Sequence, residues 1–213
     1  MSDIRIYKFG PLRSITTCVV ILIGVKLVVL ALHAGIGAYA LAMGHPIDYD
    51  KAGANDLDSL ALITDLFDRI VFVVSGTVSL IWIYHAAGNT RSLSMPTMKP
   101  AWAVAWFFIP LLGLYKPYEY VRDIWASAQA LQGDRVRRDA LPVTMWWCFF
   151  LGGNALVIIG REISDPAGAL YTVVGCVLSW IATVFFLVLV RNVSALQNSA
   201  DVRLAEEAVS NPS

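Results

Sequence analysis

Four long apolar runs constrain the fold of this chain more than any other feature. They cover residues 15–43, 66–87, 141–160 and 169–190. Each has at least the ~20 residues that an α-helix needs to cross the hydrocarbon core of a bilayer. Hydrophobic residues make up 57% of the chain and charged residues only 15%, against about 25% charged in soluble domains. The sequence therefore predicts an all-α integral membrane bundle of four spanning helices, as a single domain over residues 1–213.

A fifth apolar segment is interrupted by Pro100, Pro110 and Pro117. Its apolar core, residues 101–115, would make a helix of about 22 Å at roughly 1.5 Å per residue, which is short of the ~30 Å bilayer core. Irregular backbone survives at membrane depth only when it is buried in protein or lines a wet cavity. We therefore predict a proline-broken re-entrant segment over residues 101–116. A proline-kinked fifth span is the alternative.

The distribution of lysine and arginine favours the re-entrant prediction, because cytoplasmic loops are enriched in these residues. With four spans, most basic residues fall on one side, and Lys51, Arg69 and Arg161 remain on the other. With a fifth span, the excess moves to the outer side. The four-span arrangement places both termini in the cytoplasm. The formal net charge is +0, so no basic field suggests a nucleic-acid partner.

An amphipathic pattern follows over residues 117–132. Apolar side chains recur there at helical spacing, and Pro117 can begin the helix. Beside a membrane, such a helix most simply lies in the interface. We therefore expect an interfacial helix with Tyr118, Tyr120 and Trp125 at headgroup depth.

Two polar segments complete the predicted organisation. Residues 45–60 form an acidic outer loop whose oxygen donors are of the type that binds divalent cations. Their spacing fits no ligand motif, so we predict a solvated loop and no metal site. Residues 191–213 form a polar tail that we expect to extend the last helix to near Ser210. We find no catalytic or cofactor motif in the sequence, and we predict neither an enzyme nor a cofactor.

Four polar side chains reach a common depth when height is counted along each predicted span at about 1.5 Å per residue. They are Lys26, Ser75, Asn154 and Ser179. One hypothesis joins them in a polar midplane site for an anionic or proton-coupled ligand, with Lys26 as the titratable group. The simpler interpretation makes the serines and the asparagine interhelical hydrogen-bond partners, while Lys26 extends its charge toward the surface.

Tryptophan side chains concentrate around the proline-broken segment. They belong to Trp102, Trp106, Trp125, Trp146 and Trp147. Such a set can line an aromatic cleft for a lipid tail or another apolar ligand. The favoured interpretation is an aromatic belt that anchors a short element at the interface. The candidate residues of this element are Trp102, Trp106, Pro110, Pro117 and Trp125.

Three motifs occur in order along the chain. They are IWIYHAAGNTRSL from residue 81, WAVAWFFIPLLGLYKPYEYVRDIW from residue 102 and LPVTMWW from residue 141. In the first, an apolar Trp-x-Tyr run ends in a conspicuous asparagine, Asn89. Together the motifs resemble the DUF4328 family, an uncharacterised family of bacterial multi-pass membrane proteins. The resemblance covers roughly residues 66–147. It implies a location in the bacterial inner membrane and supplies no activity.

These features favour a non-enzymatic membrane protein of accessory, scaffolding or lipid-interacting type. Its active surface would be the element from Trp102 to Trp125, and its expected partners are membrane lipid and either a second copy or another membrane protein. The alternative is a small transporter or channel that uses the level of Lys26. This alternative requires an oligomer, because one four-helix bundle leaves little room for a pore.

Overall fold

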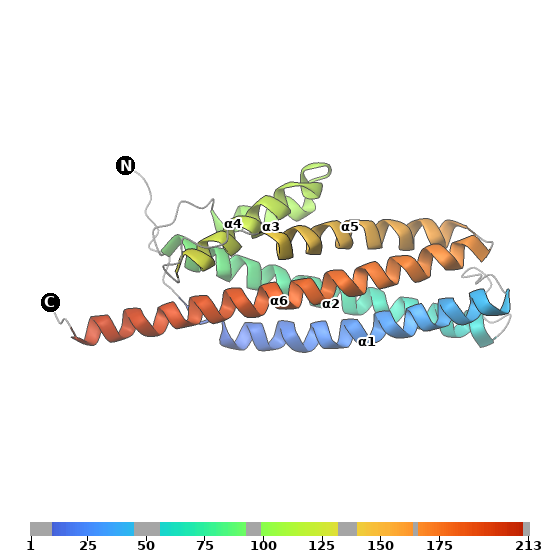
Figure 1. Ribbon diagram of the computed structural model, residues 1–213, viewed down its shortest axis with the longest axis horizontal. Coiled ribbons are helices and arrows are strands. Elements are labelled where there is room, and N and C mark those ends of the chain that lie inside the picture. Colours follow the sequence, from blue (N-terminus) through green and yellow to red (C-terminus); the bar gives the residue numbers. More distant parts are fainter. Residues whose placement is uncertain (1–9, 45–55, 93–98, 132–139, 164–165, 211–213) are drawn as a thin grey trace. The chain divides into compact units, whose positions relative to one another are not determined.

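The computed structural model describes residues 10–44, 56–92, 99–131, 140–163 and 166–210. Within these ranges the secondary structure is entirely helical (Figure 1). The long helices are α1 (Arg13–Met43), α2 (Asp56–Ser92), α5 (Leu141–Glu162) and α6 (Pro166–Ser210). Two shorter helices, α3 (Pro100–Ala105) and α4 (Lys116–Ala130), lie between α2 and α5 in sequence. The all-α prediction is confirmed for the described residues.

Each of the four predicted spans falls within a long helix that is long and apolar enough to cross a membrane. Helix α6 continues to Ser210, as expected for the tail. Helix α2 begins at Asp56, well before the predicted start of its span, so part of the expected acidic loop is helical. Asp58, in the first turn of α2, is buried, and the prediction of a solvated loop is wrong at this residue. Residues 45–55 of that loop lie outside the described residues.

The chain divides into two compact units by its internal contacts. Unit 1 contains Met1–Val20, Thr77–Thr144 and Leu187–Ser213, and unit 2 contains Ile21–Gly76 and Met145–Phe186. Every long helix contributes one segment to each unit.

Unit 1 is built around an aromatic side chain of α2. Trp82 is fully buried, as are Leu189 and Val193 of α6. The spacing of the two α6 residues places them on one face of that helix, and burial of such a face is the main stabilising contribution to a helix in a folded protein. The core of unit 1 therefore includes the part of α6 that the sequence presents as the start of a polar tail.

Unit 1 also contains a helical hairpin, residues 99–131, in which α3 and α4 pack against each other. Between them the chain forms short 3-10 turns at Trp106–Phe108 and Leu112–Leu114. The reversal occurs at Leu111, where the Pro110 carbonyl accepts a hydrogen bond from the Leu112 amide at 2.8 Å. Leu111 has a positive φ of 65°, which identifies a strained γ-turn.

Unit 2 contains a close packing of α5 against α6. Glycine permits it, because a Cβ added at Gly153 would lie 2.9 Å from the Gly175 carbonyl oxygen and 2.5 Å from the Ser179 hydroxyl. A Cβ added at Gly160 would meet the Gly168 carbonyl oxygen at 2.7 Å. Small residues let membrane helices approach closely in this way. We call Gly153, Gly160, Gly168 and Gly175 the glycine seam.

Candidate functional site

Unit 2 holds a cluster of charged side chains inside helices of spanning length. The Lys26 ammonium of α1 donates a hydrogen bond to Asp68 Oδ1 of α2, with Nζ and Oδ1 2.6 Å apart. The two side chains are 13% and 15% exposed. Lys26 Nζ also lies 5.4 Å from the centroid of the Phe72 ring, a distance at which a cation is attracted to the aromatic face.

A second carboxylate of α2 is held by two arginines. Asp65, whose side chain is 1% exposed, accepts a hydrogen bond from Arg69 Nε at 2.8 Å and another from the Arg161 guanidinium. Arg69 lies one turn further along α2 and is 60% exposed, whereas Arg161 comes from α5 and is 22% exposed. The pair with Arg161 is thus the buried one, and it joins two helices that are distant in sequence.

Two further groups complete this charged cluster. His33 of α1 is buried, and it lies within electrostatic range of Asp65, Asp68, Arg161 and Lys26. Cys176 of α6 is also buried, and the same four charges act on it. The cluster therefore has contributions from all four long helices. We define it as Lys26, His33, Asp65, Asp68, Arg69, Arg161 and Cys176.

The four residues of the predicted midplane site all lie in unit 2, but each makes other contacts. The Ser75 hydroxyl donates to the Phe72 carbonyl and the Asn154 amide to the Phe150 carbonyl, each within its own helix. Ser179 lies at the glycine seam. Lys26 is paired with Asp68. Among the described residues, no hydrogen bond joins two of the four.

The midplane site stays a prediction, but counting heights along separate helices did not identify the residue that Lys26 contacts. Asp68 and Ser75 are seven residues apart on α2, which corresponds to about 10 Å along the axis. Lys26 therefore contacts a different level of α2 from the one predicted. The sequence did carry a signal for the true partner, because Asp68 is a second charge within a spanning run that needs a counter-charge.

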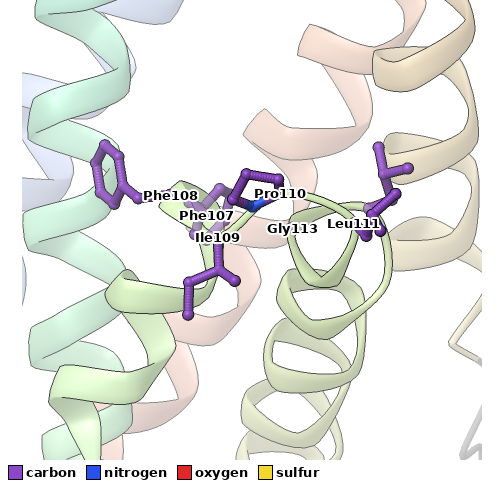
Figure 2. Close-up of a pocket in the computed structure, with 7 residues that line it drawn as sticks. Phe107, Phe108, Ile109, Pro110, Leu111 and Gly113 are labelled. Atoms are coloured by element: carbon purple, nitrogen blue, oxygen red, sulfur yellow. The ribbon is translucent and has the colours of Figure 1, made fainter.

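The tip of the hairpin presents apolar side chains to its surroundings. Phe108 is 72% exposed and Leu111 is 82% exposed. Figure 2 shows these two side chains pointing away from the turn in different directions. Pro110 lies between them and is exposed, and Gly113 follows. A pocket of about 320 Å³ at this turn is lined by Phe107, Phe108, Ile109, Pro110, Leu111, Gly113 and Leu114.

The first arm of the hairpin carries two of the predicted tryptophans, Trp102 in α3 and Trp106 directly after it. The Trp102 and Trp106 rings stack with centroids 4.9 Å apart. Trp102 is exposed, whereas the indole nitrogen Nε1 of Trp106 is buried and has no hydrogen-bond partner among the described residues. A buried donor of this kind costs about 1–3 kcal/mol when it stays unpaired. The hairpin therefore carries this cost within its own packing.

The remaining aromatic residues of the predicted element face protein. Tyr120 and Trp125 of α4 are buried, as is Pro117. The Tyr120 hydroxyl donates to the Lys99 carbonyl at 2.9 Å. The rings of Tyr120 and Trp125 are therefore covered by protein, and the headgroup depth of this helix stays a prediction. The apolar stripe of α4 is real, but it packs into unit 1.

The predicted tryptophan set divides between the two units. Trp146 and Trp147 belong to unit 2 and are buried there. Trp146 packs against Phe186 of α6, with centroids 5.1 Å apart, and Trp147 stacks on Phe150 at 5.5 Å. These two tryptophans serve the packing of α5 and α6 and do not belong to the hairpin.

An ion pair lies at the start of α4. Lys116 Nζ donates to Glu119 Oε2 at 2.6 Å. This hydrogen bond lowers the pKa of the Glu119 carboxyl and raises the pKa of the Lys116 ammonium. Both side chains are partly exposed, so the pair is accessible to solvent ions.

A buried network of neutral polar groups explains the conspicuous asparagine of the first motif. Asn89 binds both backbone groups of Gly10: its Oδ1 accepts from the amide at 3.0 Å and its Nδ2 donates to the carbonyl at 2.9 Å. Asn89 Nδ2 also donates to Gln197 Oε1, and Trp82 Nε1 donates to the Ser194 hydroxyl at 3.0 Å. The Leu12 amide donates to Asn198 Oδ1. We call Gly10, Leu12, Trp82, Asn89, Ser194, Gln197 and Asn198 the amide network.

The helices, the charged cluster and the hairpin define an all-helical protein with four helices that can cross a membrane. The comparison with protein families matches residues 45–206 to a domain of unknown function, DUF4328. The chain belongs to this family. The match includes the last long helix as well as the three motifs, and it leaves out α1. No curated protein and no solved structure matches the chain.

Proposed function

We propose that this protein is a non-enzymatic, lipid-interacting scaffold of the bacterial inner membrane. Its working part is the hairpin, which dips into the bilayer from the cytoplasmic side and returns. The observation that carries the proposal is the exposed apolar tip, where Phe108 and Leu111 project from a strained turn (Figure 2). An exposed apolar tip is costly in water and stable in hydrocarbon.

The lengths of the hairpin helices support re-entry over a fifth span. The six residues of α3 rise only about 9 Å and the fifteen of α4 about 22 Å. Neither reaches the ~30 Å of the bilayer core, and the chain reverses between them. Four crossings leave both termini on one side, and the bias of lysine and arginine makes that side the cytoplasm.

The composition of the hairpin fits an interfacial depth. Its tip is apolar, whereas Lys99 lies at its base and the stacked pair Trp102 and Trp106 lies along its first arm. Lys116 follows the turn at the start of α4, where it pairs with Glu119. Tryptophan prefers the headgroup level, and lysine extends its charge to water. These features give the hairpin an apolar turn with one lysine on each arm, Lys99 and Lys116.

Depth-dependent fluorescence quenching tests the proposal. In a cysteine-free background, Leu111→Cys carries an environment-sensitive dye, and the protein is reconstituted in vesicles that contain lipids brominated at different depths. We expect strong quenching by bromines below the headgroups. The matched control is Ala126→Cys, on the exposed face of α4, which should be quenched weakly. Equal and weak quenching at both positions would contradict insertion of the tip.

Labelling in intact cells tests the orientation. Ala130→Cys, at the end of α4, is exposed to a membrane-impermeant maleimide. Re-entry from the cytoplasm predicts protection until the membrane is opened. Labelling from outside would mean that the segment crosses as a fifth, kinked span.

A second candidate function is a small oligomeric transporter or channel. The charged cluster favours it, because ionisable side chains within spanning helices often mark ion or proton pathways. In this candidate function the transport site would lie at Lys26 and Asp68, and not at the four residues of the predicted midplane site. The two candidates separate in proteoliposomes: a transporter gives solute- or proton-dependent flux, and a scaffold gives none while retaining bound lipid.

A further inference from the structure

The first turns of α4 carry a group of charged side chains whose signs alternate along the helix. Its members, in order, are Lys116, Glu119, Arg122 and Asp123. The only other charged side chain among the described residues of the hairpin, 99–131, is Lys99. The group therefore has two positive and two negative members and no net charge. We call these four residues the mixed-charge cluster.

The members of the mixed-charge cluster interact with one another and stay accessible. Lys116 Nζ lies 2.6 Å from Glu119 Oε2, and Arg122 Nη2 lies 3.7 Å from Asp123 Oδ1. The hydrogen bond from Lys116, and at longer range the charge of Arg122, lower the pKa of the Glu119 carboxyl. The two pairs thus lie within electrostatic range of each other. All four side chains are between 23% and 56% exposed, so a polar ligand can reach them.

Each of these charged groups can form more hydrogen bonds than its partner in the chain uses. An ammonium and a guanidinium each have several donors, and a carboxylate accepts at both of its oxygens. The bond to Glu119 uses one donor of the Lys116 ammonium. A ligand can therefore bind the cations and the carboxylates of the mixed-charge cluster without opening either ion pair.

The mixed-charge cluster follows directly after the apolar turn. Leu111 of the turn is almost fully exposed, and Tyr115 is exposed as well. Lys116 Nζ lies 5.7 Å from the centroid of the Tyr115 ring, and the Arg122 guanidinium lies 5.8 Å from that of Tyr118, which is within cation–π range. Apolar side chains, aromatic rings and balanced charges thus follow one another along the hairpin. A phospholipid has the same order from its acyl chains to its headgroup.

We propose that the mixed-charge cluster binds the headgroup of a zwitterionic amino-phospholipid. The phosphate lies at Lys116 and Arg122, and the ammonium lies at Glu119 and Asp123. The acyl chains lie against the exposed apolar side chains of the turn. This inference rests on the proposed function, because it names the class of lipid that the hairpin binds.

The signs of the four charges favour this headgroup over an anionic one. An anionic headgroup is attracted to Lys116 and Arg122, but it also lies near the carboxylates of Glu119 and Asp123, which repel it. A zwitterionic headgroup places an opposite charge against each kind of side chain. A primary ammonium also donates charge-assisted hydrogen bonds to carboxylates. The cluster therefore selects a lipid by its charge pattern and not by net charge.

Native mass spectrometry of the full chain tests the proposal by competition between two lipids. The detergent-solubilised protein is mixed with equal amounts of phosphatidylethanolamine and phosphatidylglycerol, and the abundance of the two lipid complexes is compared. We expect the wild type to retain phosphatidylethanolamine in preference by about threefold or more, a ratio that two exposed ion pairs can supply. Equal retention, or a preference for phosphatidylglycerol, would overturn the proposal.

A double substitution with a matched control shows whether the mixed-charge cluster is responsible. Glu119→Gln combined with Asp123→Asn removes the partners of the ammonium, so the preference should change to phosphatidylglycerol. Asp201→Asn combined with Glu206→Gln removes the same number of carboxylates from α6 and should keep the wild-type preference. The same result in both variants would mean that net charge controls the choice of lipid, and the proposal would fail.

The cations of the mixed-charge cluster supply a second measurement. Lys116→Gln combined with Arg122→Gln removes the partners of the phosphate, so retention of both lipids should fall, and unchanged retention would contradict the proposal. The dye at Leu111→Cys separates this inference from the proposed function. Quenching of the dye without any lipid preference would refute the headgroup site and leave the insertion of the tip standing. Absence of quenching would refute the insertion, and with it the headgroup site.

Discussion

The two units of this protein bury polar groups of opposite character. In unit 1 the buried groups are amides and hydroxyls, centred on Asn89 and Ser194. In unit 2 they are ions, centred on Asp65 and Lys26. Helix α2 supplies residues to both sets, Asn89 to the first and Asp65 to the second. The difference therefore arises from side chains at particular positions and not from the type of secondary structure.

This difference bears on function, because the two kinds of group have different energetic costs. A neutral donor that is matched to an acceptor contributes about 0.5–1.5 kcal/mol. A buried ion must recover a desolvation penalty of several kcal/mol, and replacing a buried pair by apolar residues is often neutral or stabilising. The amide network is thus sufficiently explained by stability. The same account does not explain why the charged cluster is there.

The largest expected effect comes from breaking the buried ion pair of unit 2. Arg161→Met should destabilise the protein by about 3–5 kcal/mol, because it removes the buried partner of Asp65. Arg69→Met is the matched control, since it removes the exposed partner of the same carboxylate. It should cost about 0–1 kcal/mol. Unfolding by sodium dodecyl sulfate in mixed micelles measures both. If both variants lost the same free energy of unfolding, the buried Arg161 and the exposed Arg69 would contribute equally, which would contradict this prediction.

A smaller effect is expected from the neutral network of unit 1. Asn89→Leu leaves both backbone groups of Gly10 without their side-chain partner, and it should cost about 2–3 kcal/mol. The same substitution at Asn154 removes a hydrogen bond within one helix and should cost less than about 1 kcal/mol. The midpoints of thermal unfolding in detergent compare the two variants. A larger decrease of the unfolding midpoint for Asn154→Leu than for Asn89→Leu would support the predicted midplane site.

Packing at the glycine seam should give an effect of similar or smaller size. Gly153→Ala places a methyl group 2.8 Å from the Ser179 amide nitrogen, so the helices must separate at a cost of about 1–3 kcal/mol. Gly152→Ala meets only Leu178 Cδ1, at 3.9 Å, and should be nearly neutral. The same mixed-micelle unfolding assay applies. A neutral Gly153→Ala would mean that α5 and α6 approach less closely than described.

The smallest expected effect is a pH dependence at the start of α4. The pKa of Glu119 is lowered by its hydrogen bond from Lys116. The stabilisation is therefore present above the ordinary glutamate pKa, and it is lost as the pH falls through the lowered value. Hydrogen exchange of the Glu119 amide, which donates to the Tyr115 carbonyl, should accelerate relative to the intrinsic rate in that acidic range. Lys116→Gln should remove most of this pH dependence.

The sequence predicted the helices well because their signal is strong and local. Runs of about 20 apolar residues specify spanning helices without knowledge of their neighbours. The three prolines likewise predicted where the fifth segment breaks, and the chain reverses next to Pro110. The sites were harder to predict, because they depend on which faces meet. The pairing of Lys26 with Asp68, and of Arg161 with Asp65, joins residues whose relative heights a count along single helices does not give.

The amide network is a second case in which the sequence indicated one residue of a site but not its partners. The family resemblance drew attention to Asn89, and the structure supplies the reason, since Asn89 binds the backbone of Gly10. Its other partner, Gln197, lies in a stretch that composition alone classes as a polar tail. A buried glutamine in a polar segment has no local signature. It becomes visible only once α2 and α6 are known to pack in unit 1.

The pair between Asp65 and Arg161 has a consequence for the biogenesis of the chain. The two residues are 96 positions apart, so the ribosome makes the carboxylate long before its buried counter-charge. Until α5 is synthesised, α2 carries an acidic group whose only guanidinium is the exposed neighbour one turn away. The later helix therefore supplies a counter-charge that the earlier part of the chain lacks during synthesis.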